Sequence, residues 1–366
     1  MSFFCRIFGH TPDADGVCRR CGTDTRSARV PSRALRFRRM KGTRECALVG
    51  AGKCRDTAVV VPAYHRGRPV RKIAARAFAH YLAENDSATP YTVELPRSVE
   101  CIGPHAFAHS ALTDVTYGNE SCTLGEGVFY GCHALDHAPL PAALSELPAR
   151  ALARCTSLVS IDLDERILSI GEGALAGCAA LEHLSYNDKQ AVLGAHALEG
   201  CVKLAEITLP PDMAALPDRL LYGCESLTAV RLPERLQLIG EGALAFCCQL
   251  ETLTLPNTLS ELGASALMGC SSLRALSFPP SLTLIGGDET SEGGALEGCE
   301  CLQSIELYPG IVRFPARMLS GCRSLVDIEL HGTSADWRAI QKDETFDLDS
   351  ATYVVHCVNG RIRKGH

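Results

Sequence analysis

A repeat of 23 residues constrains the fold of this sequence more than any other feature does. The segments ALAGCAALEHL (174–184), ALEGCVKLAEI (197–207) and LLYGCESLTAV (220–230) share a Gly-Cys pair with a Leu three residues after the Cys. Aligning this frame gives eleven repeats, spaced 22, 23 or 29 residues apart. They start at Ala77, Ala106, Val128, Ala151, Ala174, Ala197, Leu220, Ala243, Ala266, Ala295 and Met318. A fixed period of this length predicts a solenoid, in which each repeat forms one coil.

Each repeat divides into three segments, which are clearest in LTAVRLPERLQLIGEGALAFC (227–247). The first, L-x-x-I/V-x-L-P, alternates like a strand and ends at proline. The second, L-x-x-I-G, ends at a glycine suited to a turn with positive φ. The third, G-x-x-A-L-x-x-C, brings small and apolar residues together and predicts a tight turn or a short helical turn. No coil has enough core to fold alone, so stacked coils must bury one continuous column.

The composition supports a large aliphatic core and a reducing environment. Of the 366 residues, 46% are hydrophobic and only 6% are aromatic. The first residues, MSFFCRIFGHTPDADG, do not form a signal peptide pattern, and no run of about 18 apolar residues occurs. In a chain without an export signal, 19 cysteines are expected to be thiols or metal ligands rather than disulfides. We therefore expect a cytoplasmic protein.

The repeat frame, L-x-x-I/V-x-L-P-x-x-L-x-x-I-G-x-x-A-L-x-x-C, resembles the leucine-rich repeats of the BspA or Treponema type. Residues 54–78 resemble the lead-in coil of that family and residues 325–360 its closing segment, so the resemblance covers roughly residues 45–360. It implies an α/β-type solenoid, a curved stack of about eleven coils of 22–29 residues, mostly β with short helical turns and capped at both ends. It also implies a binding scaffold rather than an enzyme. Family members are often exported surface proteins, and this chain departs from them because it lacks an export signal.

Five parts are expected along the chain. Residues 1–25 form a zinc-ribbon-like tag, residues 26–44 a basic linker and residues 45–76 a lead-in capping coil. Residues 77–331 hold the leucine-rich repeats, and residues 332–366 form a C-terminal cap and tail.

Nine cysteines occupy one position of the repeat and are expected to form a buried ladder. Equivalent positions on neighbouring coils should lie about 4.8 Å apart, whereas a disulfide requires Cβ atoms about 3.8 Å apart. No other residues supply the convergent ligands of a metal site, and buried cysteine packs as a small hydrophobe. Off the ladder, Cys248 and Cys301 are the thiols most expected to be exposed. The ladder consists of Cys132, Cys155, Cys178, Cys201, Cys224, Cys247, Cys270, Cys299 and Cys322.

The N-terminal stretch CRIFGHTPDADGVCRRCG (5–22) contains a different cysteine arrangement. Cys5, His10, Cys18 and Cys21 follow the spacing C-x4-H-x7-C-x2-C-G. In a C-x2-C-G knuckle two thiolates can bind one ion, and Cys3His is a standard structural zinc set. The pattern resembles short bacterial zinc-ribbon-like tags and predicts one structural zinc ion. A tail with incidental cysteines and a redox pair are the alternatives.

The segment RSARVPSRALRFRRMKGTR (26–44) has eight basic residues and no acidic one. Residues 1–75 contain 17 Lys and Arg against 5 Asp and Glu, whereas the rest of the chain contains 19 against 37. Such an arm can bind phosphates or anionic lipid; the alternatives are a solvated linker or an arm docked on the acidic body. The polyanion-binding candidates are Arg33, Arg36, Arg38, Arg39 and Lys41.

The variable strand positions are the candidate partner-binding surface, because in leucine-rich repeats they face the concave side. Here they are small, polar and mildly acidic, without the Trp, Tyr or Phe typical of binding hot spots. They form either a solvated sheet face or an acidic surface for a basic partner. The insertion around GGDETSEGG (286–294) adds three acids in a loop. The candidates are Asp114, Asp162, Glu206, Arg231, Glu306, Asp327, Glu329, Asp288, Glu289 and Glu292.

An enzyme is not expected. His137 and His183 occupy one stripe two coils apart, about 10 Å, too far to share a metal. The sequence has no Gly-rich phosphate loop and no triad signature. We therefore expect a non-catalytic protein-interaction scaffold, and the alternative is a nucleic-acid or anionic-membrane binder acting through residues 1–45.

Overall fold

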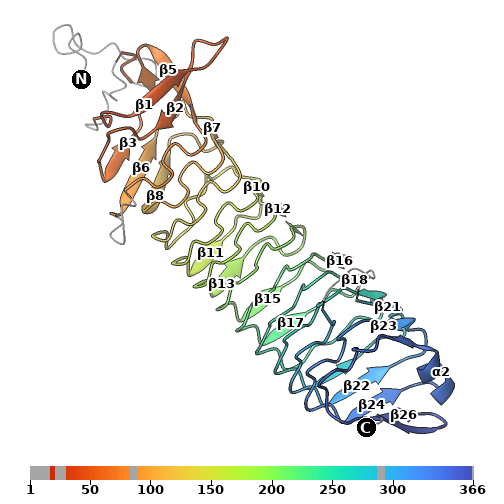
Figure 1. Cartoon of the computed structure of the whole chain (residues 1–366). Helices are drawn as coiled ribbons and strands as arrows, with labels where there is room; N and C mark the ends of the chain where they lie inside the picture. The colour runs from red at the N-terminus through yellow and green to blue at the C-terminus, as the bar shows by residue number, and fades with distance from the viewer. Residues whose placement is uncertain (1–16, 21–29, 83–88, 287–292, 365–366) are drawn as a thin grey trace. The chain divides into compact units, whose positions relative to one another are not determined.

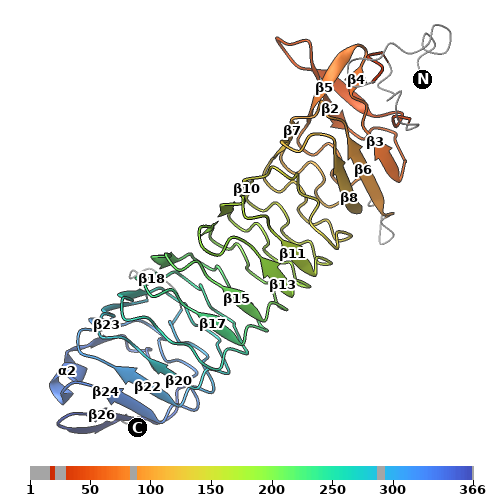
Figure 2. The ribbon, with the colours of Figure 1, turned by 180° about the vertical axis from the view of Figure 1, so that it is seen from behind.

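The described residues wind into coils in both compact units of the chain, residues 1–179 and residues 180–366 (Figures 1 and 2). This computed structural model describes residues 17–20, 30–82, 89–286 and 293–364. Most coils have three sides, one for each segment of the repeat: a strand, a two-residue strand and a turn. No helix among these residues is long and apolar enough to cross a membrane.

The first segment of most repeats forms a strand, and these strands pair in several short parallel sheets that we together call the first sheet. In the first unit these are β3 (Ala58–Val60), β6 (Tyr91–Leu95), β8 (Leu112–Tyr117) and β11 (Ser160–Asp162). In the second unit they are β13 (His183–Ser185), β15 (Glu206–Thr208), β17 (Ala229–Arg231), β20 (Ala275–Ser277), β22 (Ser304–Leu307) and β24 (Asp327–Leu330). Neighbouring strands pair in parallel, as in β3-β6-β8 and β20-β22-β24. Ile305 and Ile328 are buried while Glu306 and Glu329 face outward, which is the alternation that the repeat predicts.

The second segment forms strands of only two residues, which pair in several short sheets that we together call the second sheet. In the first unit these are β7 (Cys101–Ile102), β9 (Thr123–Leu124), β10 (Glu146–Leu147) and β12 (Ser169–Ile170). In the second unit they are β14 (Val192–Leu193), β16 (Ala215–Leu216), β18 (Leu238–Ile239), β19 (Glu261–Leu262), β21 (Leu284–Ile285), β23 (Arg313–Phe314) and β25 (Gln341–Lys342). Ile239 pairs with Leu262 and Leu262 with Ile285, so equal repeat positions stack in register.

The third segment forms tight turns rather than short helical turns, the two conformations that the sequence predicts for it. Two residues with positive φ flank each Ala/Leu-Leu pair, for example Arg219 (φ 53°) and Gly223 (φ +70°). The N–H groups of these residues donate to Glu241 and Ala245 of the next coil at 2.8 and 2.7 Å. Hydrogen bonds therefore join neighbouring coils on the turn side as well as through the two sheets.

All nine ladder cysteines are fully buried, as the sequence predicts, and every cysteine in the described residues is a free thiol. The structure adds a feature that the sequence did not reveal. Within each unit the thiol donates to a main-chain oxygen of the preceding coil, as from Cys178 to Leu152 (3.2 Å) and from Cys270 to Leu244 (3.2 Å). Burial raises the pKa of the Cys178 and Cys270 thiols to about 12, so they remain protonated at neutral pH.

Both ends of the chain add strands to the solenoid. At the N-terminal end, β1 (Arg36–Arg39) pairs antiparallel with β2 (Cys46–Gly50), which pairs in parallel with β5 (Arg68–Ile73). The strand β4 (Tyr64–His65) forms a hairpin with β5. The expected basic linker, residues 26–44, therefore contains an edge strand, and the boundary at residue 44 falls inside a hairpin.

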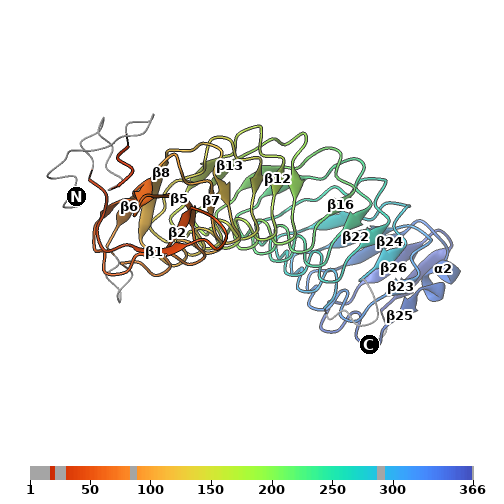
Figure 3. The ribbon, with the colours of Figure 1, turned by 90° about the horizontal axis from the view of Figure 1, so that it is seen from above.

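At the C-terminal end, β26 (Val354–Cys357) pairs in parallel with β24, and β27 (Gly360–Arg363) pairs antiparallel with β26. The helix α2 (Ser334–Ala339) begins at a Thr333–Asp336 capping box and lies at this end of the second unit (Figure 3). The described residues of the two units form about 13 turns, slightly more than the eleven expected, because the lead-in and closing segments also stack as coils.

Candidate interaction surface

The outward side chains of the first sheet form the candidate surface, which we call the first-sheet face. In the second unit, strands β20, β22 and β24 lie side by side in parallel register (Figure 2). One outward row runs through Ala275, Ser304 and Asp327, and the next row runs through Ser277, Glu306 and Glu329. The register therefore aligns the variable positions in two rows, as the repeat predicts.

Several of the predicted partner-binding carboxylates have partners within the chain. Glu306 accepts a hydrogen bond from Ser277 (2.5 Å) and pairs with His331 (2.5 Å). These two contacts, that with Ser277 first, hold the pKa of Glu306 below its usual value. Asp327 lies 2.8 Å from Nε2 of His356. Neither histidine is on the predicted rows, so the sequence did not reveal these contacts.

A similar arrangement occurs in the first unit at Asp114. Its carboxylate lies 3.3 Å from Nε2 of His137, whose Nδ1 lies 2.7 Å from Asp136. The hydrogen bond with Asp136, followed by the contacts with Asp114, raises the pKa of His137. A partner that binds Asp114 must therefore displace or accommodate this imidazole.

Of the remaining predicted partner-binding residues, four are exposed in the structure and three lie outside the residues that it describes. Asp162, Glu206, Arg231 and Glu329 are exposed on the first-sheet face. The acids of the insertion, Asp288, Glu289 and Glu292, lie outside the described residues. Three of the predicted carboxylates on the first-sheet face, those of Asp114, Glu306 and Asp327, therefore contact histidines.

A groove of about 480 Å³ lies on the first-sheet face at β3, β6 and β8. The outward side chains that line it are Ala58, Val60, Thr92, Glu94, Asp114 and Thr116. Val30 forms part of its lining and is 53% exposed. The backbone beside it is fixed to β3 by a hydrogen bond from the Ser32 N–H to the Val60 oxygen (2.9 Å). Sequence reasoning missed this groove because residues 30–32 and β3 are brought together only by the fold.

The predicted zinc site falls largely outside the described residues. Cys5, His10 and Cys21 are not among them, and Cys18, which is, is fully buried. In the part of the chain that the structure describes, no three His, Cys, Asp or Glu side chains are grouped to hold a metal. The N-terminal zinc set therefore remains a prediction from the sequence.

Cys248 and Cys301, the off-ladder thiols expected to be exposed, behave differently. Cys301 is exposed, as expected, whereas Cys248 is half-buried and donates to the oxygens of Phe246 (3.4 Å) and Gly269 (3.7 Å).

The polyanion-binding candidates Arg33, Arg36, Arg38, Arg39 and Lys41 are all exposed, three of them on β1.

Solved structures of bacterial repeat proteins share this fold. A leucine rich cell surface protein from Faecalibacterium prausnitzii A2-165 is 20% identical and covers 87% of this chain and 100% of its own, with a TM-score of 0.53. The pneumococcal vaccine antigen PcpA is 15% identical and covers 90% of this chain and 98% of its own, with a TM-score of 0.54. At these identities the likeness concerns the fold alone. No curated protein matches the sequence.

The family is defined by the repeats themselves. Residues 71–204 and 191–292 match the model of the BspA type leucine rich repeat region, in six copies. These residues span more than half of the chain and contain both the repeat frame and most of the cysteine ladder. The chain therefore belongs to the BspA-type leucine-rich repeat proteins.

Proposed function

We propose that this protein is a non-catalytic scaffold that binds another protein through its first-sheet face. The observation that carries this proposal is the groove on β3, β6 and β8, which opens among outward side chains of three parallel strands. A repeat scaffold of this kind presents side chains at fixed spacing, which suits an extended partner surface.

The lining of the groove indicates the chemistry of the partner. Ala58, Val60 and the methyl groups of Thr92 and Thr116 offer apolar contact, while Glu94 and Asp114 supply carboxylates. A lysine or arginine side chain matches this combination, because its aliphatic stem packs on apolar atoms and its charged end pairs with a carboxylate. We therefore expect a partner that inserts a basic side chain here.

Blocking the groove tests this proposal. The double substitution Thr92→Arg and Thr116→Arg places two bulky cations in the groove at exposed positions. The matched control is Thr123→Arg and Ser145→Arg, at exposed positions of the second segment in the same unit. Binding of each variant to a purified partner, first captured with the full chain, is measured by calorimetry. At least a tenfold loss for the groove variant alone supports the proposal, and equal affinity for all three proteins overturns it.

The free thiols favour a reducing compartment, so the proposed location is the cytoplasm. Nine free thiols in one buried ladder are most easily maintained where disulfides do not persist. The exposed Cys301 provides the measurement. A membrane-impermeant maleimide should leave Cys301 unmodified in intact cells and modify it after lysis. Modification in intact cells contradicts the cytoplasmic location.

A further inference from the structure

The N-terminal cap, residues 30–76, has a charge opposite to that of the rest of the chain. It contains 13 Lys and Arg residues against Glu45 and Asp56. Six of these cations lie on strands: Arg36, Arg38 and Arg39 on β1, and Arg68, Arg71 and Lys72 on β5. The cap is therefore a folded basic surface rather than a flexible basic tail.

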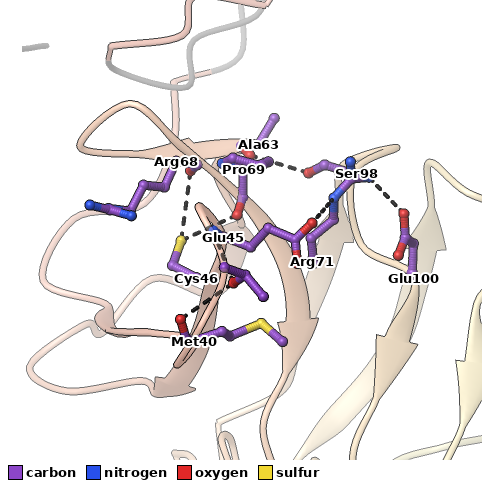
Figure 4. Close-up of polar contacts among 10 residues, drawn as sticks. Met40, Glu45, Cys46, Ala63, Arg68, Pro69, Arg71, Ser98 and Glu100 are labelled. Carbon is purple, nitrogen blue, oxygen red and sulfur yellow. Dashed lines mark hydrogen bonds and ion pairs between the residues drawn. The ribbon is translucent and has the colours of Figure 1, made fainter.

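Ion pairs neutralise only part of this charge. Arg71 contacts Glu45 (3.5 Å) and Glu100 (2.7 Å), as Figure 4 shows. In the same view the guanidinium group of Arg68 points away from the other residues drawn, while its main-chain oxygen accepts a hydrogen bond from the Cys46 thiol. The cations that contact no carboxylate among the described residues include Arg36, Arg38, Arg39, Lys41, Arg66 and Arg68, which we call the basic cap surface.

An aromatic contact brings the two parts of the basic cap surface together. The ring of Phe37 on β1 stacks on the imidazole of His65 on β4, with centroids 4.3 Å apart and planes 18° apart. This contact places the β4–β5 hairpin, which carries Arg66 and Arg68, against β1, which carries Arg36, Arg38 and Arg39. Burial and then the charge of Arg66 lower the pKa of His65, which is consistent with a local excess of positive charge.

Protection of a sheet edge does not explain this surface. A charge on an edge strand discourages pairing with another chain, and β1 is the edge of its sheet. One or two charges on β1 would serve that purpose. Arg66 lies in the turn of the other hairpin and Arg68 pairs within it, so neither guards the β1 edge.

We propose that the basic cap surface binds the phosphodiester backbone of a single-stranded nucleic acid. Five of its six cations are arginines, whose planar guanidinium groups form paired hydrogen bonds with phosphate oxygens. The Phe37–His65 pair adds a ring surface of the kind on which bases stack. A lipid surface is less well matched, because Val30 is the one large, exposed apolar side chain that the structure describes in this cap.

Salt-dependent binding to labelled oligonucleotides tests this proposal. Fluorescence anisotropy is measured with the full chain and labelled oligo-dT and oligo-U of about 20 nucleotides over a series of salt concentrations. The cap variant carries Arg36→Gln, Arg38→Gln, Arg66→Gln and Arg68→Gln. The control carries Arg235→Gln, Arg274→Gln, Arg323→Gln and Arg361→Gln, which makes the same change in net charge at exposed positions of the second unit. Circular dichroism of both variants confirms folding.

We expect the wild type to bind with an affinity that falls as salt rises, by about 0.7 logarithmic units per tenfold salt for each phosphate contact. The cap variant should bind at least tenfold more weakly with a flatter salt dependence, and the control should stay within twofold of wild type. Equal losses in the two variants, or no salt-dependent binding by the wild type, overturn the proposal. Binding to phosphatidylserine vesicles without binding to either oligonucleotide also overturns it and assigns the surface to lipid.

Discussion

The Sγ atom of Cys247 lies 3.4 Å from the main-chain oxygen of Leu221 in the preceding coil. The same oxygen accepts the N–H of Cys224, at 3.1 Å, within its own turn. The thiol thus gives a buried carbonyl group a second, weak hydrogen bond while filling a small apolar space. The position therefore suits a small apolar side chain that can donate a hydrogen bond, and cysteine, which meets both needs, occurs there in nine repeats.

Replacing one ladder cysteine should destabilise the solenoid. Cys247→Ala leaves a small cavity and removes the bond to Leu221, and we expect a loss of about 1–2 kcal/mol in the free energy of unfolding. Cys301→Ala, at an exposed position, should change it by less than about 0.5 kcal/mol. Urea unfolding followed by circular dichroism measures both. If the two variants lose the same amount, the ladder does not contribute as described.

The thiols should separate into two classes by reactivity. Burial raises the pKa of Cys224 and Cys322 to about 12, so almost no thiolate is present at pH 8, whereas Cys301 is exposed. Limited treatment with iodoacetamide followed by peptide mass spectrometry should show rapid modification of Cys301. The ladder should react only after denaturant is added. Modification of a ladder cysteine as fast as Cys301 in the native protein would contradict its burial.

Gly269 should tolerate a methyl group poorly because of Phe246. Its φ is +72°, and a Cβ atom there would lie 2.6 Å from the Phe246 ring. Gly223 has nearly the same φ, +70°. A Cβ atom added there would lie 3.8 Å from its nearest neighbour, the Cα atom of Gly200, which is an ordinary van der Waals distance. We expect Gly223→Ala to cost about 1 kcal/mol, from the backbone alone, and Gly269→Ala about 2–4 kcal/mol.

The double variant Phe246→Ala with Gly269→Ala separates the two effects in thermal or urea unfolding. If the ring causes the clash, the glycine substitution should cost no more in the Phe246→Ala background than it does at Gly223. Costs that simply add in the double variant would show that the ring is not responsible.

Two histidines of the first unit should have pKa values shifted in opposite directions from the usual value. Asp136 and Asp114 raise the pKa of His137, so its contribution to stability is complete below the unfolded pKa of about 6.5 and is lost as pH rises through the folded value. Burial and the neighbouring His80 lower the pKa of His109, so its contribution is complete above about pH 6.5 and is lost as pH falls. Proton NMR of the imidazole rings should place His137 above and His109 below that value. Asp136→Asn should lower the pKa of His137 and leave that of His109 unchanged.

The sequence predicts the parts of this protein that repeat. A Leu, Ile or Val recurs at each inward position, so the coil, both rows of the first-sheet face and the buried ladder follow from one period. Features that depend on contacts outside the period could not be predicted. The basic composition of residues 26–44 does not indicate that part of this segment forms the strand β1 and pairs with β2. The contact between Asp327 and His356 joins a repeat strand to the closing strand, where the frame no longer applies. The groove at β3 depends on the path of residues 30–32, for which the repeat provides no template.

The zinc prediction rests on four residues of which only Cys18 lies in the described part of the chain, so it requires a direct measurement. We expect the purified wild type to contain about one zinc ion per chain, since a Cys3His set holds one ion. Removing two of the four ligands with Cys18→Ser and Cys21→Ser should abolish this zinc, because two ligands cannot hold the ion tightly. Cys301→Ser removes an exposed thiol outside the set and should retain full zinc content. Elemental analysis after dialysis against a weak chelator measures all three proteins, and equal zinc in the double variant and the wild type would exclude this site.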